Sequence, residues 1–166
     1  SNSRGIYGSS CSGDVYIYNN VVNMNDTVSI AIGYQNLTDG SADVYILNNT
    51  IFGTKVYNGI LTSETLDPKI KNNIIQNNVG GYVLNISNWN GDTSNIDYNI
   101  YYNSLNSNLI NVDGITVDFG FWQGYMFDEH SYNLDPQFVN EENGNLQLQD
   151  TSPAKDAGIN LSGLYT

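Results

Sequence analysis

The sequence is poor in basic residues. It contains five Lys and Arg against 17 Asp and Glu, which gives a formal net charge of −12. Binding to nucleic acid depends on cations that neutralise phosphates, so this balance argues against a nucleic-acid partner. An anionic polysaccharide would be repelled in the same way unless a divalent cation bridged the two. The composition identifies no cofactor, and calcium is the one candidate.

Cysteine and long apolar runs are also scarce. The single cysteine, Cys11, cannot form a disulfide within the chain, and the role of a small buried apolar residue suits it best. No stretch approaches the roughly 18 apolar residues of a membrane-spanning helix, so we expect no membrane span. Residues 1–5 lack the apolar segment of a secretion signal, and we expect any such signal to lie outside this sequence.

The abundant residues are Asn, Gly, Ser, Thr and Tyr. They favour short strands and turns and include few strong helix formers. A chain of 166 residues suits a single domain. The composition therefore predicts one all-β domain.

An internal repeat organises the first two thirds of the chain. A pattern of alternating apolar residues followed by paired asparagines occurs at residues 15–22, 44–51, 69–75 and, in a decayed form, 95–101. The last asparagine of each copy is Asn20, Asn49, Asn73 or Asn99, at steps of 29, 24 and 26 residues. Repeats of this size are typical of solenoid proteins, and the variable steps place insertions in loops.

A second apolar strand lies between successive copies, at residues 5–7, 28–32, 59–61, 82–86 and 109–112. In residues 15–18 the alternation predicts Val15 and Ile17 facing inward, with Tyr16 and Tyr18 facing outward. One repeat cannot bury such a face alone, and stacking supplies a continuous core. We predict a right-handed parallel β-helix of about four to five coils over residues 1–112. Because residues 5–7 already form a strand with no cap before it, we expect further coils on the N-terminal side.

The recurrent asparagines have a physical explanation. Asparagine tolerates the left-handed backbone conformation of a sharp bend between strands. Its side-chain amide can also bond to the equivalent amide one coil away. We predict such a ladder from Asn20, Asn49, Asn73 and Asn99.

The repeat stops near residue 113, where irregular and aromatic sequence begins. Residues 113–166 are predicted to be a C-terminal capping segment of the same domain, since an uncovered last coil would expose a strand edge and an apolar end. Within it, Trp122 is expected in the core of the cap. His130, the only histidine, is expected to make structural hydrogen bonds.

The coils, and above all the C-terminal motifs, resemble a known superfamily. These motifs are Phe121-Trp122 and residues 128–131, 135–139, 144–148 and 152–158. They resemble the C-terminal part of secreted bacterial right-handed parallel β-helix proteins of the pectate-lyase-like superfamily. The resemblance implies a secreted or cell-surface protein with a polysaccharide partner. The superfamily includes lyases, hydrolases, epimerases and adhesins, so the resemblance implies no single reaction.

Few residues stand out as candidates for chemistry. Lys55 and Tyr57 precede a predicted strand on the side where this superfamily builds its cleft. Both are candidates for substrate binding, and Lys55 is also a candidate for a catalytic base. Trp89 lies in a polar loop, where it could either bind substrate as a platform for sugar stacking or pack against a neighbouring loop. Lys69 and Lys71 are expected to be solvated. No metal site is assigned, because four aspartates lack regular ligand spacing: Asp92, Asp97, Asp113 and Asp118.

Three functions remain open at this point. The first is the C-terminal portion of an extracellular lyase or glycoside hydrolase whose main catalytic groups lie upstream, with this segment as scaffold and glycan-binding surface. The second is a non-catalytic, adhesin-like surface protein, and the third is a glycan-binding module. A base and carboxylates converging beside Lys55 would favour an enzyme. A flat face of Tyr and Asn would favour binding.

Overall fold

The computed structural model describes residues 4–9, 13–24, 28–33, 43–53, 58–63, 68–77, 81–87, 92–105, 107 and 109–164. Four residues discussed above lie outside these ranges: Cys11, Lys55, Tyr57 and Trp89. The described chain is built mostly of β-strands in parallel sheets, so the prediction of an all-β protein is confirmed. No helix in the described part is both long enough and apolar enough to cross a membrane.

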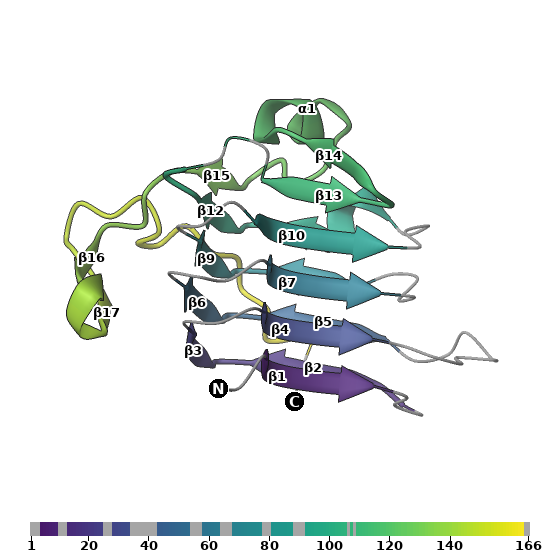
Figure 1. Ribbon diagram of the computed structural model, residues 1–166, viewed down its shortest axis with the longest axis horizontal. Helices are drawn as coiled ribbons and strands as arrows, with labels where there is room; N and C mark the ends of the chain where they lie inside the picture. The colour runs from purple at the N-terminus through teal and green to yellow at the C-terminus, as the bar shows by residue number, and fades with distance from the viewer. Residues whose placement is uncertain are drawn as a thin grey trace.

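Sheet A is the longest of three sheets that run side by side (Figure 1). Five of its strands are parallel, and the sixth closes its edge as an antiparallel hairpin. In spatial order the strands are β1 (Arg4–Ser9), β4 (Val28–Gly33), β7 (Asn58–Ser63), β10 (Tyr82–Ser87), β13 (Ile110–Val112) and β14 (Ile115–Val117).

Sheets B and C are parallel throughout. Sheet B contains β2 (Val15–Tyr18), β5 (Val44–Leu47), β8 (Lys69–Lys71) and β11 (Ile96–Asp97). Sheet C contains β3 (Val21–Met24), β6 (Thr50–Gly53), β9 (Ile74–Asn77), β12 (Ile100–Tyr102) and β15 (Tyr132–Asn133). The chain visits sheets A, B and C in turn, and we call each set of three strands a rung.

The core lies between the three sheets and consists of columns of aligned apolar residues. In sheet B one column consists of Ile17, Ile46, Ile70 and Ile96, which are aligned across the four strands and all buried. Burial of each such side chain contributes about 1.5–3 kcal/mol. The alternation read from residues 15–18 is reproduced, with Ile17 buried and Tyr16 and Tyr18 exposed.

The bend from sheet B to sheet C requires one left-handed residue in each rung. These residues are Asn19, Asn48, Asn72 and Tyr98, with φ between 54° and 59°. The expectation that the ladder asparagines themselves adopt this conformation is wrong, because in each rung the residue before the ladder position adopts it. The bend sends that side chain toward solvent and the next one, such as Asn73, into the interior.

The top of the stack is closed by an antiparallel turn and a short helix. Asp113 and Gly114 both have positive φ, 50° and 83°, which is the conformation of a two-residue type I′ hairpin between β13 and β14. Helix α1 (Phe119–Gly124) follows, and its first turn is capped by the Asp118 carboxylate, which accepts a hydrogen bond from the Phe121 amide. The helix buries Phe119 and Trp122 against the core.

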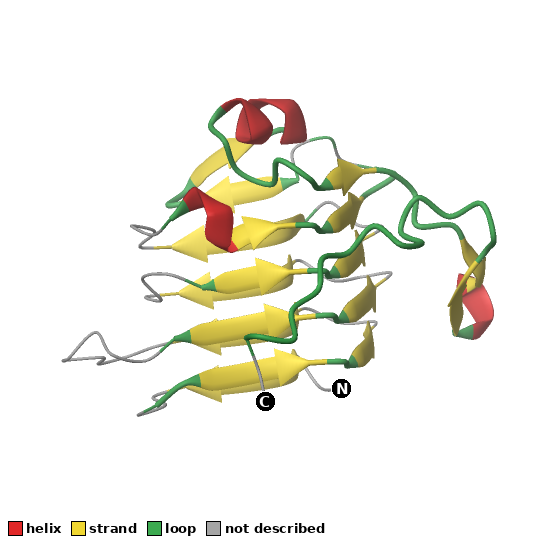
Figure 2. Cartoon of the chain, turned by 180° about the vertical axis from the view of Figure 1, so that it is seen from behind, coloured by secondary structure: helices red, strands yellow, loops and turns green. Residues whose placement is uncertain are grey.

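The C-terminal segment covers the last rung and also packs along sheets B and C. Strand β15 pairs in parallel with β12, so sheet C extends past residue 113. Strands β16 (Phe138–Asn140) and β17 (Asn145–Leu148) form an antiparallel pair whose Phe138 ring packs edge-on against Phe52 of sheet C. Residues 150–164 then run back along the stack (Figure 2), where the Asn72 side chain exchanges two hydrogen bonds with the backbone of Ile159.

Candidate functional site

The outer face of sheet A carries mainly amide and hydroxyl side chains. Along β10, Leu84 and Ile86 are fully buried in the core, so the alternating residues Asn85 and Ser87 face outward and are half-buried. The register places Leu61 and Asn111 beside Asn85, Ser63 beside Ser87, and Thr116 beside Asn111. Tyr7 lies in the same row as Leu61, and the side chains of Asn58 and Tyr82 reach this face through Asn85 and Thr116. We define the sheet A face by this set, which is Tyr7, Asn58, Leu61, Ser63, Tyr82, Asn85, Ser87, Asn111 and Thr116.

Hydrogen bonds across strands fix several of these side chains. The Tyr82 hydroxyl lies 3.0 Å from Thr116 Oγ1, and Asn111 Nδ2 donates to the same oxygen at 3.2 Å. Asn111 Oδ1 accepts from the Gly114 amide in the β13–β14 turn. These contacts anchor the end of the face nearest the cap.

The sheet A face is also nearly free of charge. In the six strands of sheet A, Arg4 is the only charged residue, although the whole chain has a net charge of −12. Parallel strands repeat at about 4.8 Å, so outward side chains such as Leu61 and Asn85 stand beside each other along the stack. The face therefore combines neutral donors and acceptors with apolar side chains.

The outer face of sheet B differs from that of sheet A, because it carries aromatic rings and charged side chains. Tyr16 and Tyr45 stack with centroids 4.5 Å apart and planes 4° from parallel, so their faces cover each other. Lys69 Nζ lies 5.6 Å from the centroid of the Tyr45 ring and forms an ion pair with Asp43. The Tyr45 hydroxyl also donates to Asp43, and burial, followed by this carboxylate, raises the pKa of Tyr45 to about 12.

The predicted ladder residues are hydrogen-bonded in sequence through the interior. Asn20 Nδ2 donates to Asn49 Oδ1, Asn49 Nδ2 to Asn73 Oδ1, and Asn73 Nδ2 to Asn99 Oδ1, each at 3.0 Å. Each of the same oxygens also accepts from the backbone amide of the preceding ladder residue. The ladder thereby ties each rung to the next at the bend between sheets B and C.

The ladder ends on a buried carboxylate, Asp128, which the sequence had shown only as part of a motif. Four side chains donate to it: Asn99 Nδ2, the Tyr101 hydroxyl, Trp122 Nε1 and the Ser131 hydroxyl. Burial raises the pKa of the Asp128 carboxyl above its usual value, and the four hydrogen bonds oppose that rise. Asp128 therefore joins the last rung to α1 and the rest of the cap.

His130 forms a second link between the cap and the last rung. Its Nδ1 lies 2.8 Å from Asp97 Oδ2, its backbone amide donates to Asp97 Oδ1, and its ring stacks on Tyr98. The hydrogen bond to Asp97 raises the pKa of His130 above its usual 6.5, with smaller contributions from the charges of Asp97 and Glu129. This arrangement matches the structural role expected for the histidine.

Because the pKa of His130 is higher in the folded state than in the unfolded state, its protonation stabilises the fold. The contribution is fully present below about pH 6.5 and is lost as the pH rises through the folded-state pKa. We expect His130→Gln to remove this part of the pH dependence. Urea unfolding of both proteins between about pH 5 and about pH 9 measures it. Parallel stability curves for the two proteins would contradict the assignment.

The four aspartates considered for a metal lie apart in structural positions. Asp92 caps the short helix η1 (Thr93–Asn95), Asp118 caps α1, Asp113 lies in the β13–β14 turn and Asp97 holds His130. Within the described ranges, no group of three or more His, Cys, Asp and Glu side chains could hold a metal ion. Three of the four carboxylates thus have structural partners: Asp92 and Asp118 cap helices, and Asp97 binds His130.

The described basic side chains do not gather into a cleft. Lys69 pairs with Asp43 and Lys155 with the exposed Asp150, while Lys71 lies on β8 near Asp92. Lys55, Tyr57 and Trp89, the candidates for catalysis and sugar binding, lie outside the described residues, so those assignments stay predictions. A comparison of the chain with protein-family models, with curated proteins and with solved structures finds no match.

Proposed function

We propose that this chain is part of a right-handed parallel β-helix protein of the extracellular space, in which the sheet A face binds an uncharged glycan without catalysing its cleavage. The observation that carries the proposal is the neutral face of amide and hydroxyl groups on sheet A. The stacking of three parallel sheets with an internal asparagine ladder supports the β-helix part of the proposal.

The chemistry of the face suits sugar hydroxyls. An asparagine side chain carries two donors and an acceptor, and a hydroxyl carries both functions, so each pairs with a sugar hydroxyl in either direction. Asn58 and Asn85 are half-buried and near each other, with 3.4 Å between Asn85 Nδ2 and Asn58 Oδ1. The outward residue Leu61 lies beside Asn85 in the register and gives apolar contact for the C–H face of a sugar ring.

Charge supports an uncharged ligand over a uronic-acid polymer. A chain with a net charge of −12 repels a polyanion at long range, and the outward positions of β7, β10, β13 and β14 bear no base to offset this. Elimination at a uronic acid would also need a base and a cation near the reacting carbon. The described side chains of the sheet A face include neither, which favours binding without catalysis.

The double variant Asn58→Ala/Asn85→Ala tests the proposal. Each lost hydrogen bond is worth about 0.5–1.5 kcal/mol, so we expect affinity for an uncharged glycan to fall by about fivefold to about 100-fold. Isothermal titration calorimetry with soluble glucan, xylan and mannan oligosaccharides measures the change. Polygalacturonate, with and without calcium, is the charged comparator and should bind more weakly.

Asn23→Ala is the matched control, because Asn23 is exposed on strand β3 of sheet C. It should leave glycan affinity unchanged. If none of the uncharged glycans binds, or if the double variant and the control lose affinity equally, the proposal is wrong.

A further inference from the structure

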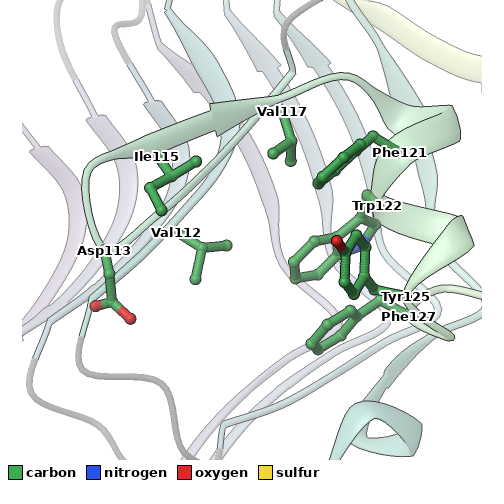
Figure 3. Close-up of a pocket in the computed structure, with 8 residues that line it drawn as sticks. All are labelled: Val112, Asp113, Ile115, Val117, Phe121, Trp122, Tyr125 and Phe127. Atoms are coloured by element: carbon green, nitrogen blue, oxygen red, sulfur yellow. The ribbon is translucent and has the colours of Figure 1, made fainter.

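A pocket of about 350 Å³ opens at the cap (Figure 3), and none of its lining residues belongs to the sheet A face. One wall comes from the β13–β14 hairpin, and the other comes from α1 and the turn after it. The volume is about twice that of the ~150 Å³ cavity that admits benzene. The residues that line it are Val112, Asp113, Ile115, Val117, Phe121, Trp122, Tyr125 and Phe127.

The lining is apolar but stays open to solvent. Ile115, Phe121 and Tyr125 are 68%, 54% and 62% exposed, while Trp122 is buried and stacks on Phe127 with centroids 3.8 Å apart. Phe121 and Tyr125 lie with centroids 4.9 Å apart and present ring surface to solvent. A ligand that filled the pocket would remove this apolar area from water, which is favourable.

The polar groups of the pocket favour a ligand of positive charge. The Trp122 indole N–H already donates to Asp128, so it does not serve a ligand. Among the lining residues Asp113 is the only charged one, and Figure 3 shows its carboxylate at the end opposite the aromatic side chains. No lining residue offers a cation to an anionic ligand. The chain's net charge of −12 also opposes both an anion and a second copy of the chain.

We propose that this pocket binds a small amphiphilic cation, an aromatic or alkyl group that carries an ammonium. The apolar part lies between the hairpin and the aromatic side chains, and the ammonium is held by Asp113. The aromatic or alkyl part of the ligand then packs against Phe121 and Tyr125 at the other end of the pocket. The site is separate from the glycan face, and its failure would leave the proposed function standing.

Three probes with one phenylpropyl frame test the charge preference: 3-phenylpropylamine, 3-phenylpropanol and 3-phenylpropanoate. Titrations followed through the Ile115 methyl resonance by NMR should show the amine binding about twofold to about fivefold more tightly than the alcohol. The carboxylate should produce no shift. Equal affinity of amine and alcohol, tighter binding of the carboxylate, or absence of any shift would overturn the proposal, as would dimerisation through this surface.

Asp113→Asn is the informative variant. Asparagine tolerates the left-handed conformation of this turn, where φ is 50°, so the hairpin is retained. The variant should bind the amine only as tightly as the alcohol. Asp150→Asn changes the net charge equally at an exposed position and should keep the preference for the amine. If both variants lose that preference equally, net charge and not the pocket carries it, and the proposal is wrong.

Discussion

Replacement of Asp128 with Ala is expected to lower the free energy of unfolding by about 3–5 kcal/mol. The carboxylate accepts hydrogen bonds from Asn99 Nδ2, Tyr101, Trp122 Nε1 and Ser131. These four donor residues are themselves buried. Without the carboxylate, their donor groups would stay in the interior with no hydrogen-bond partner, which is costly. Urea unfolding followed by circular dichroism measures the loss.

The control for this variant is Asp150→Ala, which removes an exposed carboxylate in an ion pair with Lys155. Exposed pairs of this kind contribute little, and we expect a change of at most about 1 kcal/mol. A loss below about 1 kcal/mol for Asp128→Ala would show that the cap does not depend on this carboxylate. The hydrogen-bond account of the last rung would then be wrong.

Asn73→Ala is expected to destabilise the fold by about 2–4 kcal/mol. Asn73 is fully buried, donates to the Ile46 carbonyl and to Asn99 Oδ1, and accepts from Asn49. Its removal leaves groups of two neighbouring rungs without partners. The midpoint and slope of a urea transition report the change.

Asn20 provides the internal comparison for the ladder. It lies at the ladder end farthest from the cap, is only half-buried and bonds to a single ladder neighbour, Asn49. Asn20→Ala should therefore cost about 1 kcal/mol or less. Equal effects of Asn20→Ala and Asn73→Ala would contradict a ladder whose strength comes from buried hydrogen bonds.

Local sequence pattern predicted the strands of the stack well. The alternation in residues 15–18 and the paired asparagines recur in matching frames, and burial of one strand face forces that alternation. The ladder positions followed from the same frames, since register stacks Asn49 beside Asn73 once the strands of sheets B and C align. Each of these features depends on a residue one rung away, and the repeat places an equivalent residue at that position.

Other features were missed because they depend on residues outside the repeat. Asp128 binds Asn99, which lies 29 positions away, and the segment around Asp128 has no repeated counterpart.

Two other features did have local signals. The turn at Asp113 and Gly114 could have been predicted, because Asp-Gly between two short apolar stretches favours a type I′ hairpin. The left-handed residue was misplaced by one position, since asparagine occupies both places in three of the four bends.

The candidate site was harder to predict than the scaffold. The residues of the sheet A face come from separate strands, and only the pairing of these strands, including the antiparallel β13–β14 hairpin, brings Asn58, Asn85 and Thr116 onto one surface. No motif marks them, because asparagine and serine are common throughout this sequence. Lys55 and Trp89 were candidates because of their residue type and their place in loops beside predicted strands. Such criteria identify single reactive or aromatic residues and do not identify a neutral surface.

The most direct test of the glycan-binding proposal is NMR mapping with an uncharged oligosaccharide such as cellohexaose. The side-chain amide resonances of Asn58 and Asn85 and the methyl resonance of Thr116 report the sheet A face. We predict that these resonances shift during the titration and saturate together, while those of Tyr16 and Tyr45 on sheet B stay in place. Shifts confined to sheet B, or absent from the sheet A face with every uncharged glycan tested, would contradict the account.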